Sequence, residues 1–104
     1  MSTTAASGFQ WDSGNRAKCQ KHGLTIALIE ALFTHPHHLA PDAAHSTTET
    51  RLLAIGRGGG ARPILAAFTL REVEGELFIR PISARYMHSK EIEAYEQAFA
   101  PSHQ

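Results

Sequence analysis

The sequence predicts an α+β domain in which an antiparallel sheet carries helices packed on one face. Three strand-like runs follow one another at 51–57, 63–71 and 76–85, and glycine-bearing turns join them. Two helix-like segments precede these runs, at 15–22 and 26–33, and a third follows them. Because the helices cover one face, we expect the other face of the sheet to stay open.

Residues 8–11 predict a short strand that ends at Asp12. Asp12 or Ser13 is expected to cap the helix at 15–22, because a short polar side chain can accept a hydrogen bond from an otherwise unpaired amide. Gly23 then ends that helix, since glycine tolerates the left-handed backbone conformation.

The second helix, 26–33, is expected to begin after a Thr25 cap and to face the core. Leu24 and Ile29 occupy the two positions of a hydrophobic staple. Residues 34–48, rich in histidine, proline and alanine, are predicted to form a loop. The apolar residues that share one helical face are Leu28, Ile29, Leu32 and Phe33.

The remaining elements are two hairpins and a final helix. Gly58-Gly59-Gly60 connects the first two strands and residues 73–75 connect the last two, as in antiparallel hairpins. Ser89 is expected to cap the last helix. Its apolar stripe is formed by Ile92, Tyr95 and Phe99.

The length of 104 residues suits a single domain over residues 9–100, with flexible tails at 1–8 and 101–104. At 42% hydrophobic and 19% charged the chain can bury a core, and it has neither a membrane-length apolar run nor a signal-peptide pattern. Its single cysteine, Cys19, allows no internal disulfide and is expected in the core. We therefore expect a cytoplasmic protein without membrane contact.

The formal net charge is zero, which argues against strong non-specific nucleic-acid binding, but the charges are unevenly distributed. Between residues 51 and 90 seven basic side chains accompany three acidic ones. The last helix carries Glu91, Glu93 and Glu96. The sequence therefore predicts a basic sheet beside an acidic helix.

Two arginines, Arg80 and Arg85, interrupt the apolar run of the last strand. Five residues apart, they would face opposite sides of a regular strand, but Pro81 indicates an edge or a bulge that would realign them. They either form a guanidinium fork for a phosphate or make ordinary ion pairs. The candidate carboxylate partners are Glu49, Glu72 and Glu91.

Other basic and aromatic residues leave two interpretations open. One face of the first helix carries Lys18, Lys21 and His22. This face is either simply exposed to solvent or part of a site where His22, at the helix C-terminus, donates a proton. Arg51 and Arg57 point to one side of their strand. Tyr86, just beyond Arg85, could stack on a base.

No metal or cofactor is expected. His35, His37 and His38, with His45 further on, invite a zinc interpretation, but no cysteine or carboxylate adjoins the 35–38 cluster, and adjacent histidines in a loop usually point apart. The glycine-rich run 56–60 lacks the Gly-Lys-Ser/Thr end of a phosphate-binding loop and favours a hairpin turn.

The order of motifs over residues 9–96 resembles the BrnT family. The matching elements are Phe9-Gln10-Trp11-Asp12, Lys21-His22-Gly23, Glu49-Thr50-Arg51, the Ile79–Arg85 strand, Glu91 and Tyr95. The resemblance implies a toxin of a type II toxin–antitoxin pair with a RelE-like fold, an endoribonuclease that cleaves RNA without metal and inhibits translation. It also implies a ribbon-helix-helix antitoxin encoded nearby. The toxin would bind operator DNA only through this antitoxin.

The resemblance further implies roles for single residues. His22 would be the proton donor, Arg80 and Arg85 the phosphate clamps, and Glu49 the base or an arginine orienter. The implied catalytic set is His22, Glu49, Arg51, Arg80 and Arg85, and the implied RNA-binding set is Lys18, Lys21, Arg57 and Tyr86.

A second hypothesis is a non-catalytic binding module, an inactive homologue whose open sheet face docks an antitoxin-like protein or nucleic acid. The acidic last helix and the zero net charge favour it, because backbone binding to nucleic acid grows with the number of phosphates that the protein neutralises.

Overall fold

The computed structural model describes residues 6–45 and 48–99. In chain order the elements are β1 (Gly8–Phe9), α1 (Ser13–Gln20), α2 (Ile26–Thr34), β2 (His38–Pro41), the 3-10 helix η1 (Ala43–His45), β3 (Leu52–Gly56), β4 (Ile64–Val73), β5 (Glu76–Tyr86) and α3 (Ser89–Phe99). The predicted α+β class is confirmed. Of the expected tails, 1–5 and 101–104 lie outside the described residues, while the backbone N–H of Ser7 donates to the carbonyl of Leu77 (2.7 Å).

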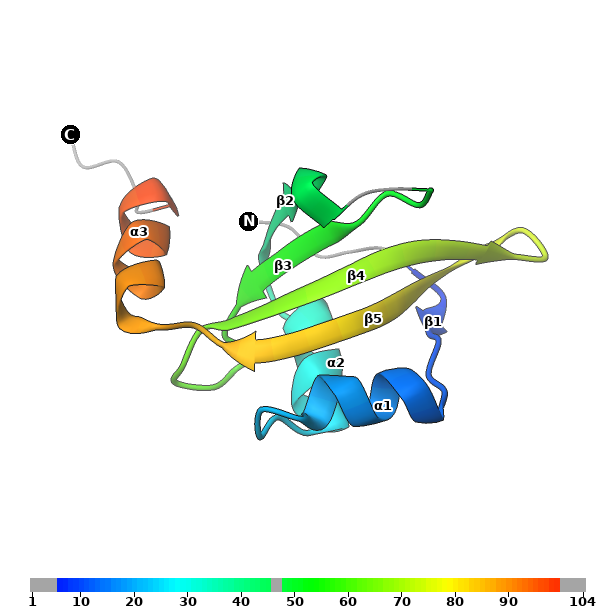
Figure 1. The fold of residues 1–104 in the computed structure, drawn as a ribbon, viewed down its shortest axis with the longest axis horizontal. Helices are drawn as coiled ribbons and strands as arrows, with labels where there is room; N and C mark the ends of the chain where they lie inside the picture. Colours follow the sequence, from blue (N-terminus) through cyan, green and yellow to red (C-terminus); the bar gives the residue numbers. More distant parts are fainter. Residues whose placement is uncertain (1–5, 46–47, 100–104) are drawn as a thin grey trace.

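The strands form one sheet in the order β1-β5-β4-β3-β2 (Figure 1). All neighbours are antiparallel except β1 and β5, which pair in parallel, so the sheet is mostly rather than wholly antiparallel. Helices α1 and α2 pack against one face, as predicted. The third helix does not: α3 lies beyond the end of β5 in Figure 1. The face opposite α1 and α2 is called the open face below.

The core lies between the sheet and the two N-terminal helices. Phe33 of α2 is at its centre, with edge-on contacts to the rings of Phe9, His37 and Phe68 at centroid distances of 5.8, 5.6 and 4.9 Å. Cys19 is fully buried, as expected, and this burial raises the pKa of its thiol to about 11.

The predicted helix caps are confirmed for α1 and α2. The Asp12 side chain accepts from the backbone N–H of Asn15, and Thr25 Oγ1 accepts from that of Leu28. Helix α1 runs from Ser13 to Gln20, two residues earlier at each end than predicted. Ser89 is the first residue of α3 rather than its cap.

The prediction of a loop over 34–48 was wrong for part of that segment, which contains β2 and η1. β2 pairs with β3 at the edge of the sheet, with half-buried His38 and Ala40 alternating with exposed Leu39 and Pro41. A four-residue edge strand that ends in proline gives little sequence signal, because edge strands tolerate residues that central strands exclude.

The three C-terminal strands occur as predicted. Glu74 and Gly75 at the tip of the β4–β5 hairpin have φ angles of 52° and 83°, the two left-handed residues of a two-residue turn. Farther along this hairpin, Ala67 pairs with Ser83 but Phe68 pairs with Pro81, so Ile82 is the extra residue of a β-bulge. The predicted bulge beside Pro81 is therefore confirmed.

Candidate functional site

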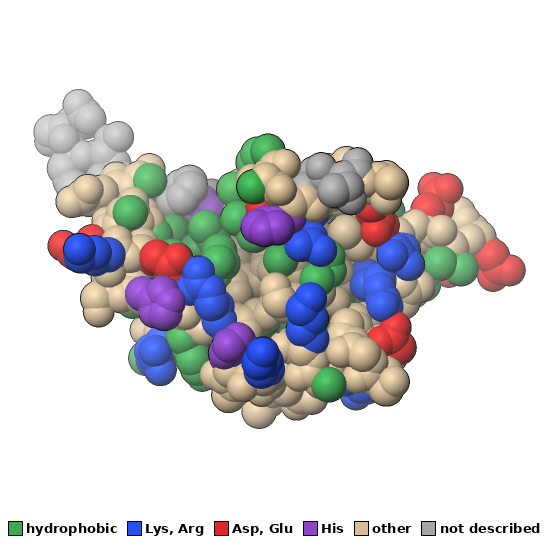
Figure 2. All heavy atoms as spheres, in the orientation of Figure 1, with side chains coloured by type: hydrophobic (Ala, Val, Ile, Leu, Met, Phe, Trp, Pro, Cys, Tyr) green, Lys and Arg blue, Asp and Glu red, His purple; other side chains and the backbone are tan. Residues whose placement is uncertain are grey.

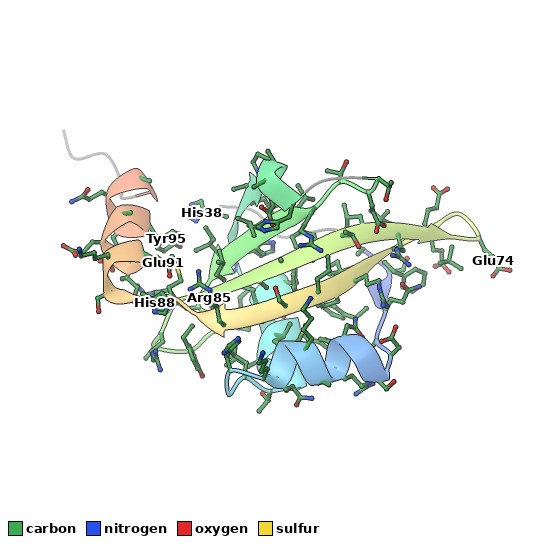
Figure 3. All side chains as sticks on the ribbon, in the orientation of Figure 1. His38, Glu74, Arg85, His88, Glu91 and Tyr95 are labelled. Carbon is green, nitrogen blue, oxygen red and sulfur yellow. The ribbon has the colours of Figure 1, made fainter. Side chains whose placement is uncertain are left out.

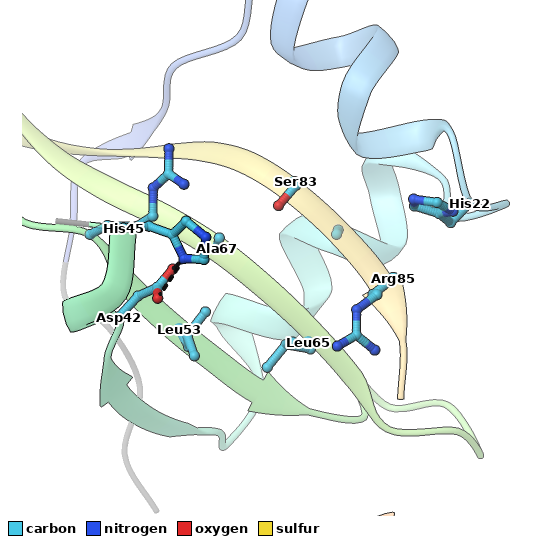
Figure 4. Close-up of a pocket in the computed structure, with 10 residues that line it drawn as sticks. His22, Asp42, His45, Leu53, Leu65, Ala67, Ser83 and Arg85 are labelled. Atoms are coloured by element: carbon cyan, nitrogen blue, oxygen red, sulfur yellow. Dashed lines mark hydrogen bonds and ion pairs between the residues drawn. The ribbon is translucent and has the colours of Figure 1, made fainter. Parts of the chain in front are cut away.

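The open face contains a cavity of about 420 Å³, a size that suits a small ligand. Small and apolar side chains from three strands form its floor (Figure 4): Leu53, Leu65, Ala67 and Ser83. The titratable side chains that line it are His22, Asp42, His45, Arg51 and Arg85. Figure 2 shows basic and histidine side chains over the middle of this face, with acidic side chains beside them and more at the tip of the β4–β5 hairpin. We call this cavity the central pocket.

Arg85 reaches the central pocket from β5 and is held by Glu91 of α3 (Figure 3). Two parallel hydrogen bonds, both 2.7 Å, join its guanidinium to the Glu91 carboxylate. This hydrogen bonding lowers the pKa of Glu91 to about 2, and it raises the pKa of Arg85. The side chains are 33% and 36% exposed, so the pair is open to solvent and to an incoming anion.

Arg80 lies on the same face of β5 as Arg85, because both sit opposite same-face residues of β4. It does not line the central pocket. It lines a second cavity, of about 360 Å³, together with Lys18, and its guanidinium donates to Asp12 at 2.7 Å. The pKa of Asp12 is lowered mainly by the hydrogen bond from the backbone N–H of Asn15. The hydrogen bond from Arg80 is the second cause.

Glu49 is engaged by an arginine that the sequence analysis did not single out. Arg71 of β4 donates to both Glu49 oxygens, at 2.9 and 3.1 Å. This hydrogen bonding is the main cause of the lowered pKa of Glu49. Glu49 does not line the central pocket.

The other candidate residues divide between the central pocket and its surroundings. His22 lines the pocket from the α1–α2 turn, and Arg51 lines it from the residue just before β3. Lys21 is exposed in the turn beside His22.

None of the four RNA-binding candidates lines the central pocket, and Lys18 lines the second cavity with Arg80. Arg57 pairs with Glu96 of α3 at 3.3 Å and donates to the carbonyl of Ala61 at 2.6 Å. The ring of Tyr86 packs against the core and lies 4.0 Å from the guanidinium carbon of Arg62.

The sequence analysis missed one pair in the pocket, Asp42 and His45. It considered His45 only as a zinc ligand and did not consider Asp42. The i, i+3 spacing of an aspartate and a histidine was the available signal. The suspected metal cluster is dispersed: His37 is buried against Phe33, and His38 contacts Tyr95. Over residues 6–45 and 48–99, no three His, Cys, Asp or Glu side chains are grouped so that they could hold a metal ion.

Two arginines and two histidines thus line a pocket on the open face of the mostly antiparallel sheet of this small α+β protein. The family model described as the ribonuclease toxin BrnT of type II toxin–antitoxin systems matches residues 11–91. The chain therefore belongs to the BrnT family. The comparison with curated proteins gives no match. Among the described residues, no helix has the length and apolar character that crossing a membrane requires.

Proposed function

We propose that this chain is a toxin that cleaves RNA without a metal ion and thereby inhibits translation. The observation that carries the proposal is the central pocket, where Arg51 and Arg85 meet His22 on the open face of a BrnT-family chain. Cleavage by the neighbouring 2′-hydroxyl needs a base, a proton donor and cations that stabilise the charged transition state. In this proposal the two arginines supply the cations and His22 donates the proton.

The Arg85–Glu91 pair is compatible with phosphate binding. Exposed ion pairs contribute little net stability, because solvent screens them. A phosphate presents the same two-oxygen geometry to a guanidinium as a carboxylate does. RNA would therefore take the place of Glu91 on Arg85, and α3 would give up this contact while substrate is bound.

The remaining basic residues extend the site beyond the pocket. Arg80 and Lys18 line the second cavity and would bind another phosphate of the RNA. Lys21, beside His22, would add positive charge at this end of the site and so attract the RNA backbone. Arg57 and Tyr86 lie farther away, so in this proposal they contact RNA outside the pocket and contribute less to its binding. Glu49 acts through Arg71, which it holds by two hydrogen bonds.

We further propose the cellular setting that family membership supports. The fold would be RelE-like, and the protein would work in the cytoplasm. A ribbon-helix-helix antitoxin encoded nearby would bind the toxin and connect it to operator DNA.

The proposal is tested by expressing the chain without any antitoxin. Growth should stop and cellular RNA should be degraded, whereas Arg85→Ala produced at the same level should be harmless. Arg62→Ala is the matched control, because Arg62 is an exposed arginine outside the central pocket. A harmless wild-type chain, or an Arg85→Ala chain as toxic as wild type, would contradict the proposal.

One observation favours the alternative of a non-catalytic binding module. Among the described residues, several arginines pair with carboxylates: Arg57 with Glu96, Arg71 with Glu49, Arg80 with Asp12, and Arg85 with Glu91. Such a module should form a complex with the product of the adjacent gene that survives gel filtration, while RNA incubated with the free chain stays whole. Cleavage of that RNA by the free chain would rule the alternative out.

A further inference from the structure

Asp42 and His45 form a carboxylate–imidazole pair at the edge of the central pocket. His45 Nδ1 lies 3.0 and 3.2 Å from the two carboxylate oxygens of Asp42. The backbone fixes this pair: the N–H of His45 donates to the carbonyl of Asp42 (3.1 Å), and the N–H of Asp42 donates to that of Arg51 (2.9 Å). The η1 turn is thereby attached to the start of β3, beside an arginine of the pocket.

The pair sets the hydrogen position on the His45 ring. An ionised carboxylate can only accept hydrogen bonds, so Nδ1 must carry the hydrogen. Nε2, across the ring, is then the nitrogen that can accept a proton. The Asp42 side chain is only 13% exposed whereas that of His45 is 65% exposed, so the carboxylate lies behind an imidazole that solvent and substrate can reach.

Among the titratable side chains that line the pocket, only two are suited to proton transfer. Arg51 and Arg85 stay protonated at any physiological pH. Asp42 is engaged by His45, and Glu49, the other candidate base, is held by Arg71 outside the pocket. The two imidazoles that remain, His22 and His45, lie at opposite sides of the pocket with Ser83 between them (Figure 4).

We propose that His45 is the general base of RNA cleavage and that Asp42 is its positioning residue, an inference that rests on the proposed function and deepens it. Nε2 of His45 takes the proton of the 2′-hydroxyl while that oxygen forms its bond to phosphorus. The bond from phosphorus to the 5′-oxygen breaks, its electron pair stays on that oxygen, and His22 supplies the proton. The products are a 2′,3′-cyclic phosphate and a free 5′-hydroxyl, and Asp42 stabilises the imidazolium formed on His45.

The first test measures cleavage of a short RNA by the full chain in the presence of chelator. His45→Gln should lower kcat by about 100-fold or more with little change in KM, since general base catalysis contributes a factor of this order. Asp42→Asn keeps an oxygen that can accept from Nδ1 and should lower kcat less, by about tenfold. His35→Gln, at an exposed histidine that does not line the pocket, should behave like wild type.

Two further measurements separate proton transfer from a structural role. Added imidazole should restore part of the activity of His45→Ala but none of that of Arg85→Ala. A substrate with sulfur in place of the 5′-bridging oxygen has a leaving group that needs no proton. This substrate should reduce the defect of His22→Gln and leave that of His45→Gln in place.

The outcomes distinguish this inference from the proposed function. If wild type cleaves the RNA and His45→Gln cleaves it equally fast, the base assignment is overturned and the ribonuclease proposal stands. A His45→Gln defect that disappears on the sulfur substrate would make His45 the acid and also overturn the assignment. If wild type leaves the RNA intact, both proposals fall.

Discussion

Arg80 and Arg85 project from the same face of β5 although five residues separate them. Arg85 is opposite Leu65 of β4 and Arg80 is opposite Thr69, two positions on one face of that strand. The bulge at Ile82 makes this possible, because one extra residue reverses the alternation of side chains beyond it. At a spacing of five residues, the shared face of Arg80 and Arg85 therefore depends on this bulge.

Deleting Ile82 should leave the fold intact. Pro81 and Ser83 would become neighbours, and their partners Phe68 and Ala67 are already neighbours in β4, so every β5 side chain would keep its face of the sheet. We expect the cooperative thermal transition, measured by circular dichroism, to remain. Deleting Ala66 from the regular strand β4 would move the side chains on one side of the deletion to the wrong face and should abolish that transition. Loss of the transition in the Ile82 deletion would contradict the assignment of Ile82 as the extra residue.

Asn15 connects α1 to the bulged strand. Its buried amide donates to the carbonyls of Gln10 (3.0 Å) and Pro81 (2.9 Å), and its Oδ1 accepts from the backbone of Asp12 (2.7 Å). Asn15→Ala leaves these buried groups unpaired and should lower the free energy of unfolding by about 2–4 kcal/mol.

Denaturant unfolding of Asn15→Ala beside Ser13→Ala tests this expectation. Ser13 is exposed in the first turn of the same helix and should change stability by no more than about 0.5 kcal/mol. Equal effects of the two substitutions would show that the Asn15 hydrogen bonds contribute no specific stability.

The Arg85–Glu91 pair predicts a pH dependence of stability. The pKa of Glu91 is about 2 in the folded chain, below its ordinary value of 4.5, because Arg85 and the His88 backbone stabilise its charged form. The contribution is therefore fully present above pH 4.5 and is lost as the pH falls through the folded pKa near 2.

Glu91→Gln should accordingly melt slightly below wild type at pH 7, and the difference should vanish between pH 4.5 and 2. The glutamine oxygen can still accept the His88 N–H, so the helix start is preserved. Glu93→Gln, at an exposed carboxylate of the same helix, is the control and should show no such convergence. A Glu91→Gln difference that persists unchanged at pH 2 would contradict the pair's electrostatic origin.

Much of the fold could be predicted from the sequence because its signals are local. The caps at Asp12 and Thr25, the hairpin at Glu74-Gly75 and the bulge beside Pro81 each arise from residues next to one another in the chain. The place of α3 could not be predicted in this way. Its contacts join residues far apart in sequence, such as Tyr95 with His38.

The site was harder to predict for the same reason. Arg85, Arg51 and His22 could be named from their surroundings, but which arginine pairs with which carboxylate depends on the strand register. Arg80 takes Asp12 as its partner, from the opposite end of the chain, and Glu49 takes Arg71. Asp42 and His45 were missed because they lie in a segment predicted to be a loop.

The most direct test of the ribonuclease account is cleavage of a short RNA by the purified chain in chelator, with the products identified by mass spectrometry. The account predicts a 2′,3′-cyclic phosphate from wild type, no cut where the 2′-hydroxyl is replaced by hydrogen, and a rate at least about 100-fold lower for Arg85→Ala. Intact RNA with wild type, or equal cleavage by wild type and Arg85→Ala, would contradict it.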